Sequence, residues 1–183
     1  MRPSRRQFLA RAARWGVLRG AGIPLLNACG GDDAGGEQST EPIADYCRGM
    51  IEDIVVIPNR LEGALWLGHE SRRRAGKKPR VGWAGAQQHL GDLEMIQEVV
   101  ETLRGEVEWV FMGMCPKFLK PHVAEEHPFV SFKEYPAKLA SLNLDLAIAP
   151  LEQHLFNEGK SNLRLLEYGI MGWPVICTDI YPY

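Results

Sequence analysis

Two cations and one carboxylate are spaced along a single helical stripe near the end of the sequence. Lys160 and Arg164 stand four residues apart, and Glu167 follows three residues after Arg164. Side chains at these spacings share one face of a helix. Lysine and arginine bind phosphate oxygens, whereas a carboxylate accepts hydrogen bonds from vicinal sugar hydroxyls. The stripe predicts a site for a diphosphate and a ribose. The alternative is a solvated face with an ion pair between residues three apart.

A helix must present that stripe, and the surrounding sequence supplies signals for its start and end. Ser161 or Asn162 serves as N-cap, and Gly172, followed by Pro174, ends the helix. Between them apolar residues recur at i, i+3 and i+7 (Leu163, Leu166, Ile170). A helix start carries unpaired N–H groups and the positive end of the helix dipole, so it suits an anion. Residues 175–178 predict a buried strand directly after this helix.

This stretch resembles the donor-nucleotide loop and helix of the GT-B glycosyltransferases, family 4 and its relatives. The matching pattern is F-N-x-x-K-S-N-x-K/R-x-x-E-Y-x-x-x-G-x-P-V-I. The positions that match are Phe156, Asn157, Lys160, Ser161, Asn162, Arg164, Glu167, Tyr168, Gly172, Pro174, Val175 and Ile176. One position departs from the pattern: many members carry a second glutamate eight residues before Glu167, where this sequence has Gly159 with Glu158 beside it.

The resemblance implies a nucleotide-diphosphate sugar as donor substrate, an unknown acceptor, no cofactor and no metal. It assigns the diphosphate to Lys160, Ser161, Asn162 and Arg164, and the ribose to Glu167. Such a site needs no metal because helix N–H groups and cations offset the charge of the leaving diphosphate. The resemblance covers one of the two domains of a GT-B enzyme, so the catalytic base stays unknown.

A second segment, residues 82–92, resembles the family pattern G-W-A-G-x-x-x-H-x-x-D. A strand that breaks at Gly85 would bring the next loop, with His89, to the carboxyl ends of the strands, where ligands bind in open α/β sheets. The resemblance places Gly85 and His89 at the donor, although a lone loop histidine is otherwise a surface residue. In the family the nucleotide base lies near the position of Tyr135, which either stacks on the base or packs on the helix beginning at Pro136.

Strand-like and helix-like segments alternate from residue 80 onward. We expect strands at 80–85, 107–113, 130–132, 144–151 and 175–178, and helices at 136–142 and from Asp92 or Leu93 to Arg104. Alternation of this kind predicts βαβ units and a mostly parallel sheet. The expected fold class is α/β, a Rossmann-like donor half of a GT-B fold, incomplete at the C-terminus because family members continue with further helices.

The beginning of the chain resembles an export signal. Residues 4–9 are similar to a twin-arginine motif and residues 26–29 to a lipobox that would leave Cys29 lipidated. We therefore divide the chain into a signal (1–29), a Gly/Asp/Ser-rich tether (30–44), a crossover segment from an absent acceptor domain (45–79) and a donor-nucleotide domain (80–183). A strand is expected within 51–59. The alternative for the first residues is a disordered tail.

Composition limits the partners. Residues 1–28 carry six arginines and no acid, so the net charge of −2 becomes −8 once these six are set aside, which argues against nucleic acid. The four cysteines and five histidines show no metal-ligand spacing. No run of 18 apolar residues occurs, so membrane attachment is expected only through lipidated Cys29. A nucleotide-sugar site implies a cytoplasmic body, which conflicts with the export signal.

Two other functions remain open at this stage. An exported, lipid-anchored solute-binding protein would explain residues 1–40, and a fusion fragment without activity would explain why a signal and a sugar-nucleotide site share one chain. Whether the protein is an enzyme is left open: we expect it to bind a donor but to transfer no sugar alone. The active cleft of a GT-B enzyme lies between two domains, and only one is recognised here.

Overall fold

Residues 42–183 are described by the computed structural model, and they belong to two compact units, 42–58 and 59–183. The expected signal, the lipidation at Cys29 and the tether up to residue 41 lie outside the described residues. The smaller unit holds helix α2 (Pro42–Arg48), followed by residues without regular structure. The strand expected within 51–59 is therefore absent. Its apolar side chains are exposed, Ile57 by 83%, and no neighbouring strand of its own unit pairs with it.

The larger unit is built on a sheet of five parallel strands in the order β3-β2-β1-β4-β5. The strands are β1 (Arg80–Gly85), β2 (Glu108–Gly113), β3 (Glu125–His127), β4 (Leu146–Ala149) and β5 (Val175–Cys177). This arrangement confirms the α/β, Rossmann-like class, because the strand order reverses beside β1 as it does in doubly wound sheets.

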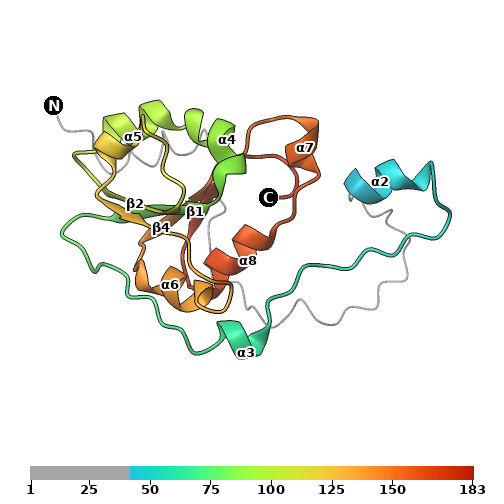
Figure 1. The fold of residues 1–183 in the computed structure, drawn as a ribbon, viewed down its shortest axis with the longest axis horizontal. Helices are drawn as coiled ribbons and strands as arrows, with labels where there is room; N and C mark the ends of the chain where they lie inside the picture. The colour runs from blue at the N-terminus through green and yellow to red at the C-terminus, as the bar shows by residue number, and fades with distance from the viewer. Residues whose placement is uncertain (1–41) are drawn as a thin grey trace. The chain divides into compact units, whose positions relative to one another are not determined.

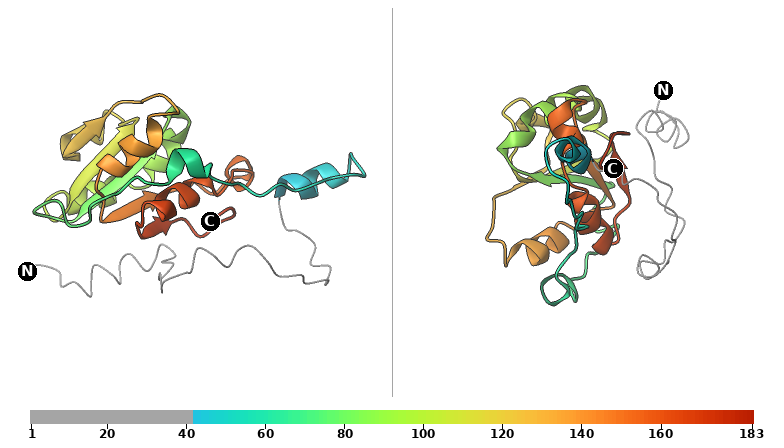
Figure 2. Two further views of the ribbon diagram at one scale, coloured as in Figure 1. Left: turned by 90° about the horizontal axis from the view of Figure 1, so that it is seen from below. Right: turned by 90° about the vertical axis from the view of Figure 1, so that its right-hand side faces the viewer.

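Helices cover both faces of the sheet (Figures 1 and 2). One face carries α4 (Leu90–Glu94) and α5 (Gln97–Leu103), and the other carries α6 (Tyr135–Ser141) and α8 (Leu163–Ile170). Shorter elements connect them: α3 (Gly63–Trp66), η1 (Gln87–His89), η2 (Lys120–His122) and α7 (Leu155–Glu158). Among residues 42–183, no helix is long and apolar enough to cross a membrane.

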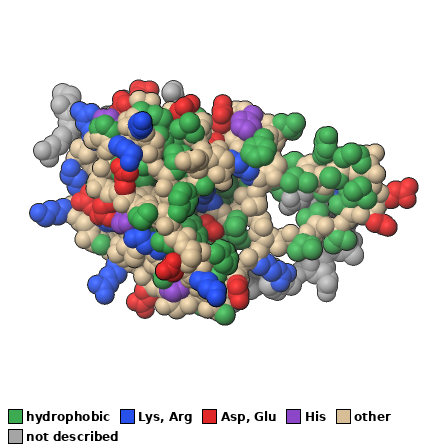
Figure 3. All heavy atoms as spheres, viewed as in Figure 1, with side chains coloured by type: hydrophobic (Ala, Val, Ile, Leu, Met, Phe, Trp, Pro, Cys, Tyr) green, Lys and Arg blue, Asp and Glu red, His purple; other side chains and the backbone are tan. Residues whose placement is uncertain are grey.

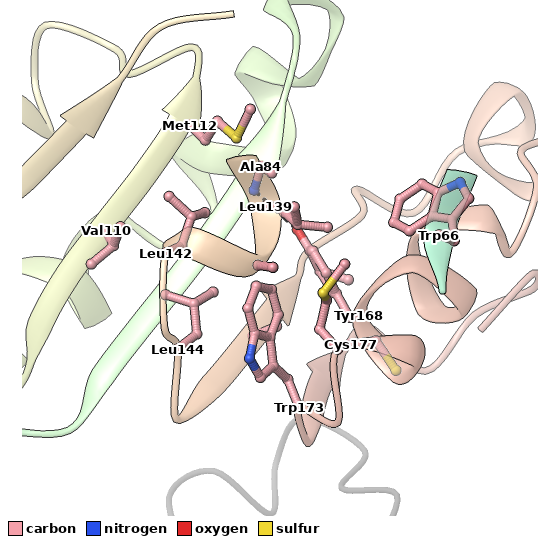
Figure 4. Packing of buried hydrophobic residues seen from close by; sticks show 14 residues of the cluster. Trp66, Ala84, Val110, Met112, Leu139, Leu142, Leu144, Tyr168, Trp173 and Cys177 are labelled. Atoms are coloured by element: carbon pink, nitrogen blue, oxygen red, sulfur yellow. Dashed lines mark hydrogen bonds between the residues drawn. The ribbon is translucent and has the colours of Figure 1, made fainter. Parts of the chain in front are cut away.

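Two hydrophobic clusters fill the space between the sheet and its helices. Alternate side chains of a strand point to opposite faces, so Trp83 and Phe111 join the cluster under α4 and α5, while Ala84 and Met112 join the other. The second cluster, under α6 and α8, includes Tyr168 and is shown in Figure 4. The near-continuous apolar runs of the central strands are therefore explained by burial on both faces.

Two of the expected elements differ in position or extent. The third strand is Glu125–His127 rather than 130–132, where the chain turns and Phe132 is 72% exposed. The helix expected up to Arg104 is divided into α4 and α5, because the Ile96 N–H bonds to the carbonyl of Leu93, three residues back, and tightens the turn. The other strands lie within the predicted ranges, and α6 begins and ends one residue earlier than predicted.

Arg80 connects the first three strands of the sheet to the end of α6. Its guanidinium donates two hydrogen bonds to Glu125, at 2.7 and 2.9 Å, and one to Glu108 at 3.2 Å. Two further bonds go to the carbonyl of Leu142. This buried side chain therefore links β1, β2, β3 and the α6–β4 connection. Elsewhere, on the face seen in Figure 3, acidic and basic side chains are interspersed.

Candidate functional site

A cavity of about 540 Å³ lies at the carboxyl ends of β1 and β2, beside the start of α8. It adjoins the point where the strand order reverses between β1 and β4, which is where open α/β sheets bind ligands. Most of the predicted site residues line it, although they come from separate parts of the sequence: Gly85, His89, Tyr135, Lys160, Ser161, Arg164 and Glu167. Asn162 does not line this cavity.

Asp92 connects the segments beside this cavity through its hydrogen bonds, although the sequence pattern gave it no role. Its carboxylate is 3% exposed and accepts hydrogen bonds from the Glu152 N–H at 2.7 Å and from Asn157 Nδ2 at 3.0 Å. Lys160 Nζ lies 3.4 Å from its other oxygen. The loop that leads from β4 to α8, including α7, is thus attached to α4 through one carboxylate.

His89 is the other partner of Asp92. Its Nδ1 lies 2.6 Å from Asp92 Oδ2, and its Nε2 lies 3.2 Å from Arg164 Nη2. Burial lowers the pKa of His89, and the nearby charges of Arg164 and Lys160 lower it further, against the opposing effect of Asp92. The imidazole is therefore neutral near pH 7, with its proton on Nδ1 facing the carboxylate and its lone pair on Nε2 facing Arg164. The alternative of a surface histidine does not hold, because the ring is buried.

Arg164 lines the cavity, and its guanidinium contacts Trp83 and His89. Its Cζ lies 5.5 Å from the centre of the Trp83 ring, a cation–π distance, and His89 accepts a bond from Nη2. Its Nη1 is buried and has no hydrogen-bond partner among the described residues. A buried donor without an acceptor is costly.

Gly85 makes room for this guanidinium. A Cβ on Gly85 would clash with the Trp83 ring and would lie 2.9 Å from Arg164 Nη2. The neighbouring strand ends in the same way: Gly113 has a φ of +92°, and a Cβ there would collide with the Gly85 carbonyl. Gly85 is therefore required by the close approach of Trp83 and Arg164, and Gly113 by its positive φ and the nearby Gly85 carbonyl.

Glu167 also lines the cavity. Its Oε2 accepts a hydrogen bond from the Tyr135 hydroxyl at 3.0 Å, which leaves its other oxygen without this bond. Burial raises the pKa of Glu167, while Tyr135 and Arg164 act in the opposite direction. The Tyr135 ring packs edge-on against Trp66, with ring centres 5.7 Å apart. Glu167 is half-buried and bonded to tyrosine, so the alternative of a solvated ion-paired face does not describe it.

The side-chain hydrogen bond at the start of α8 comes from Ser161 and not from Asn162. Asn162 is at the N-cap position of α8, but its side-chain oxygen accepts a bond from Asn59 Nδ2 at 3.2 Å. The Ser161 hydroxyl accepts a bond from the Leu163 N–H at 3.4 Å. Ser161 therefore both caps the helix and lines the cavity.

Tyr168 connects α8 to the strand beneath the cavity. Its hydroxyl accepts a bond from the Ala84 N–H at 3.0 Å, and its side chain is fully buried. Asp92, Trp83 and Tyr168 match the two family patterns, but sequence reasoning gave them no role in the site. For Asp92 a signal existed, since it follows His89 by three residues at the start of an expected helix and the two can pair on one turn. Among residues 42–183, no group of three His, Cys, Asp or Glu side chains converges as a metal-ligand set.

Comparisons with known proteins add no relative. No family model, no curated protein and no solved structure matches the chain.

Proposed function

We propose that the cavity binds the diphosphate and ribose of a nucleotide-diphosphate sugar, as the donor domain of a GT-B glycosyltransferase does. The observation that carries this proposal is the convergence of Lys160, Arg164 and Glu167, which line one cavity at the carboxyl ends of the strands. Lys160 and Arg164, which both line the cavity, supply positive charge and N–H donors for a diphosphate. Glu167 supplies a carboxylate oxygen for the ribose hydroxyls.

The alternative function, an exported solute-binding protein, depends on residues 1–40, which lie outside the described part of the chain. Donor binding is the function that residues 59–183 support best. The acceptor and the base of a transfer reaction are not assigned by these residues, so the proposal concerns the donor step.

Calorimetry of the full chain with uridine and guanosine diphosphate tests the proposal. Lys160→Ala and Glu167→Ala should each weaken binding by about 1–3 kcal/mol, the cost of losing hydrogen bonds to charged or desolvated groups. Lys117→Ala and Glu94→Ala are matched controls, since both side chains are exposed and neither lines the cavity. Equal affinity in wild type, Lys160→Ala and Glu167→Ala would reject the assignment.

A further inference from the structure

We propose that Asp92 and His89 are positioning residues that hold the Arg164 guanidinium in its binding orientation, instead of touching the nucleotide themselves. The inference rests on the proposed function for its ligand, a diphosphate, but its geometry is independent of that ligand. The three side chains form a continuous line from a buried carboxylate, through an imidazole, to a guanidinium in the cavity.

The direction of each hydrogen bond follows from the chemistry of the groups. Hydrogen bonds from His89 and from the Glu152 N–H outweigh burial and hold the pKa of Asp92 at about 2, so its carboxylate is ionised and accepts only. The His89 proton must then be on Nδ1, which leaves Nε2 as an acceptor. Arg164 can only donate, so the bond between Nη2 and Nε2 requires this tautomer.

Lys160 is held in this arrangement by its contact with Asp92 and not by a hydrogen bond to the imidazole. Its Nζ lies 3.5 Å from His89 Nδ1, but that nitrogen already carries the proton shared with Asp92. The contact that remains is the one of 3.4 Å to Asp92 Oδ2. One carboxylate therefore places both cations of the proposed diphosphate site.

Holding the guanidinium in advance favours binding. A free arginine side chain loses about 2 kcal/mol of rotamer entropy when it is fixed, and a side chain already fixed does not lose it again when an anion arrives. The Arg164 side chain is restricted by three residues: the Trp83 ring, Gly85 and His89, which bonds to Nη2. Its Nη1 has no hydrogen-bond partner in the described part of the chain. His89 is the polar member of this arrangement and the one that determines the rotation of the guanidinium plane.

Two substitutions of His89 separate this role from a purely structural one. An asparagine amide reaches the position of Nδ1, so His89→Asn keeps the bond to Asp92 and removes the acceptor for Arg164. A glutamine amide reaches the position of Nε2, so His89→Gln keeps the acceptor and removes the bond to Asp92. If His89 served only to support the loop, His89→Asn would preserve diphosphate binding better than His89→Gln. Positioning predicts the reverse order.

The first measurement needs no ligand. Nitrogen-15 NMR of the full chain should find His89 in the Nδ1–H tautomer, and Asp92→Asn should shift it toward Nε2–H. The Arg164 side-chain resonances should be those of a restrained guanidinium in wild type and His89→Gln, and of a freely rotating one in His89→Asn. An Nε2–H tautomer in wild type, or equal Arg164 mobility in wild type and His89→Asn, would overturn the inference.

The second measurement uses uridine diphosphate as the probe. Affinity for it should be about tenfold higher in His89→Gln than in His89→Asn, the scale of one charge-assisted hydrogen bond. Tighter binding by His89→Asn would also overturn the inference. If wild type binds neither uridine nor guanosine diphosphate while the NMR results are as expected, the proposed function fails and the positioning of Arg164 stands.

Discussion

Asp92 is the residue on which the geometry of the cavity depends most directly. An aspartate ordinarily has a pKa of 3.8, and its hydrogen bonds hold the pKa of Asp92 at about 2. Between these values the unfolded chain binds more protons than the folded one, so the stabilisation is fully present above about pH 4. It is lost as the pH falls through about 2.

Asp92→Asn should therefore destabilise the protein by roughly 2 kcal/mol at pH 7, the free-energy equivalent of that shift. The difference from wild type should shrink as the pH is lowered from 4 toward 2, because wild type loses its charged carboxylate there. Urea unfolding at pH 7 and pH 3 measures both values. Glu94→Gln, an exposed carboxylate of the same helix, is the control and should change little at either pH. A constant difference at both pH values would contradict an ionised Asp92.

The sequence predicted the residues that line the site better than the residues that hold them in place. Lys160, Arg164 and Glu167 were predictable because they lie on or beside one helix, where spacing decides which side chains share a face. The pairing of Asp92 with His89 has a local signal, but its other contacts do not, because Glu152, Asn157 and Lys160 reach it from 60 to 68 residues away. Local spacing carries no information about partners that the fold brings together.

At the scale of elements, one hydrogen bond joins α8 to β1 beneath the cavity. The Tyr168 hydroxyl accepts the Ala84 N–H inside the hydrophobic cluster. Tyr168→Phe leaves this buried N–H without an acceptor and should cost about 1–3 kcal/mol of unfolding free energy. Denaturant unfolding measures the loss, and Tyr135→Phe, at the cavity wall, provides a comparison that leaves this bond intact. Equal stability of wild type and Tyr168→Phe would show that the bond contributes nothing.

The strands were predictable to different degrees for a physical reason. The sequences of β1, β2 and β4 contain apolar runs because both faces of each strand are covered, and these runs identify a strand without knowledge of its neighbours. β3 reads Glu-Glu-His, and Arg80 on β1 supplies the partner of its first glutamate. A strand stabilised by a charge from another strand shows no hydrophobic period, so the sequence favours residues 130–132, with Val130 and Phe132, in its place.

At the scale of the whole larger unit, Arg80 is the connection that spans most of the sheet. Removing it takes away the Arg80 donors of Glu108, Glu125 and the Leu142 carbonyl, and leaves Glu125 only its contact with His127. Arg80→Met should therefore cost at least about 2 kcal/mol of unfolding free energy. Thermal unfolding compares it with Arg104→Met, an exposed arginine after α5. A loss no larger than that of Arg104→Met would indicate that the strands hold their order without this residue.

The charges of β3 also bear on how the sheet meets other molecules. An edge strand presents unpaired backbone groups on which a second chain can extend the sheet, and charged side chains on such a strand oppose that extension. On β3, Glu125 forms an ion pair with Arg80, and Glu126 forms one with the exposed Lys120 at 2.6 Å. A second copy aligned there would bring like carboxylates together in partly dry surroundings. The charges of β3 therefore oppose strand addition at the edge of the sheet that lacks a hydrophobic pattern.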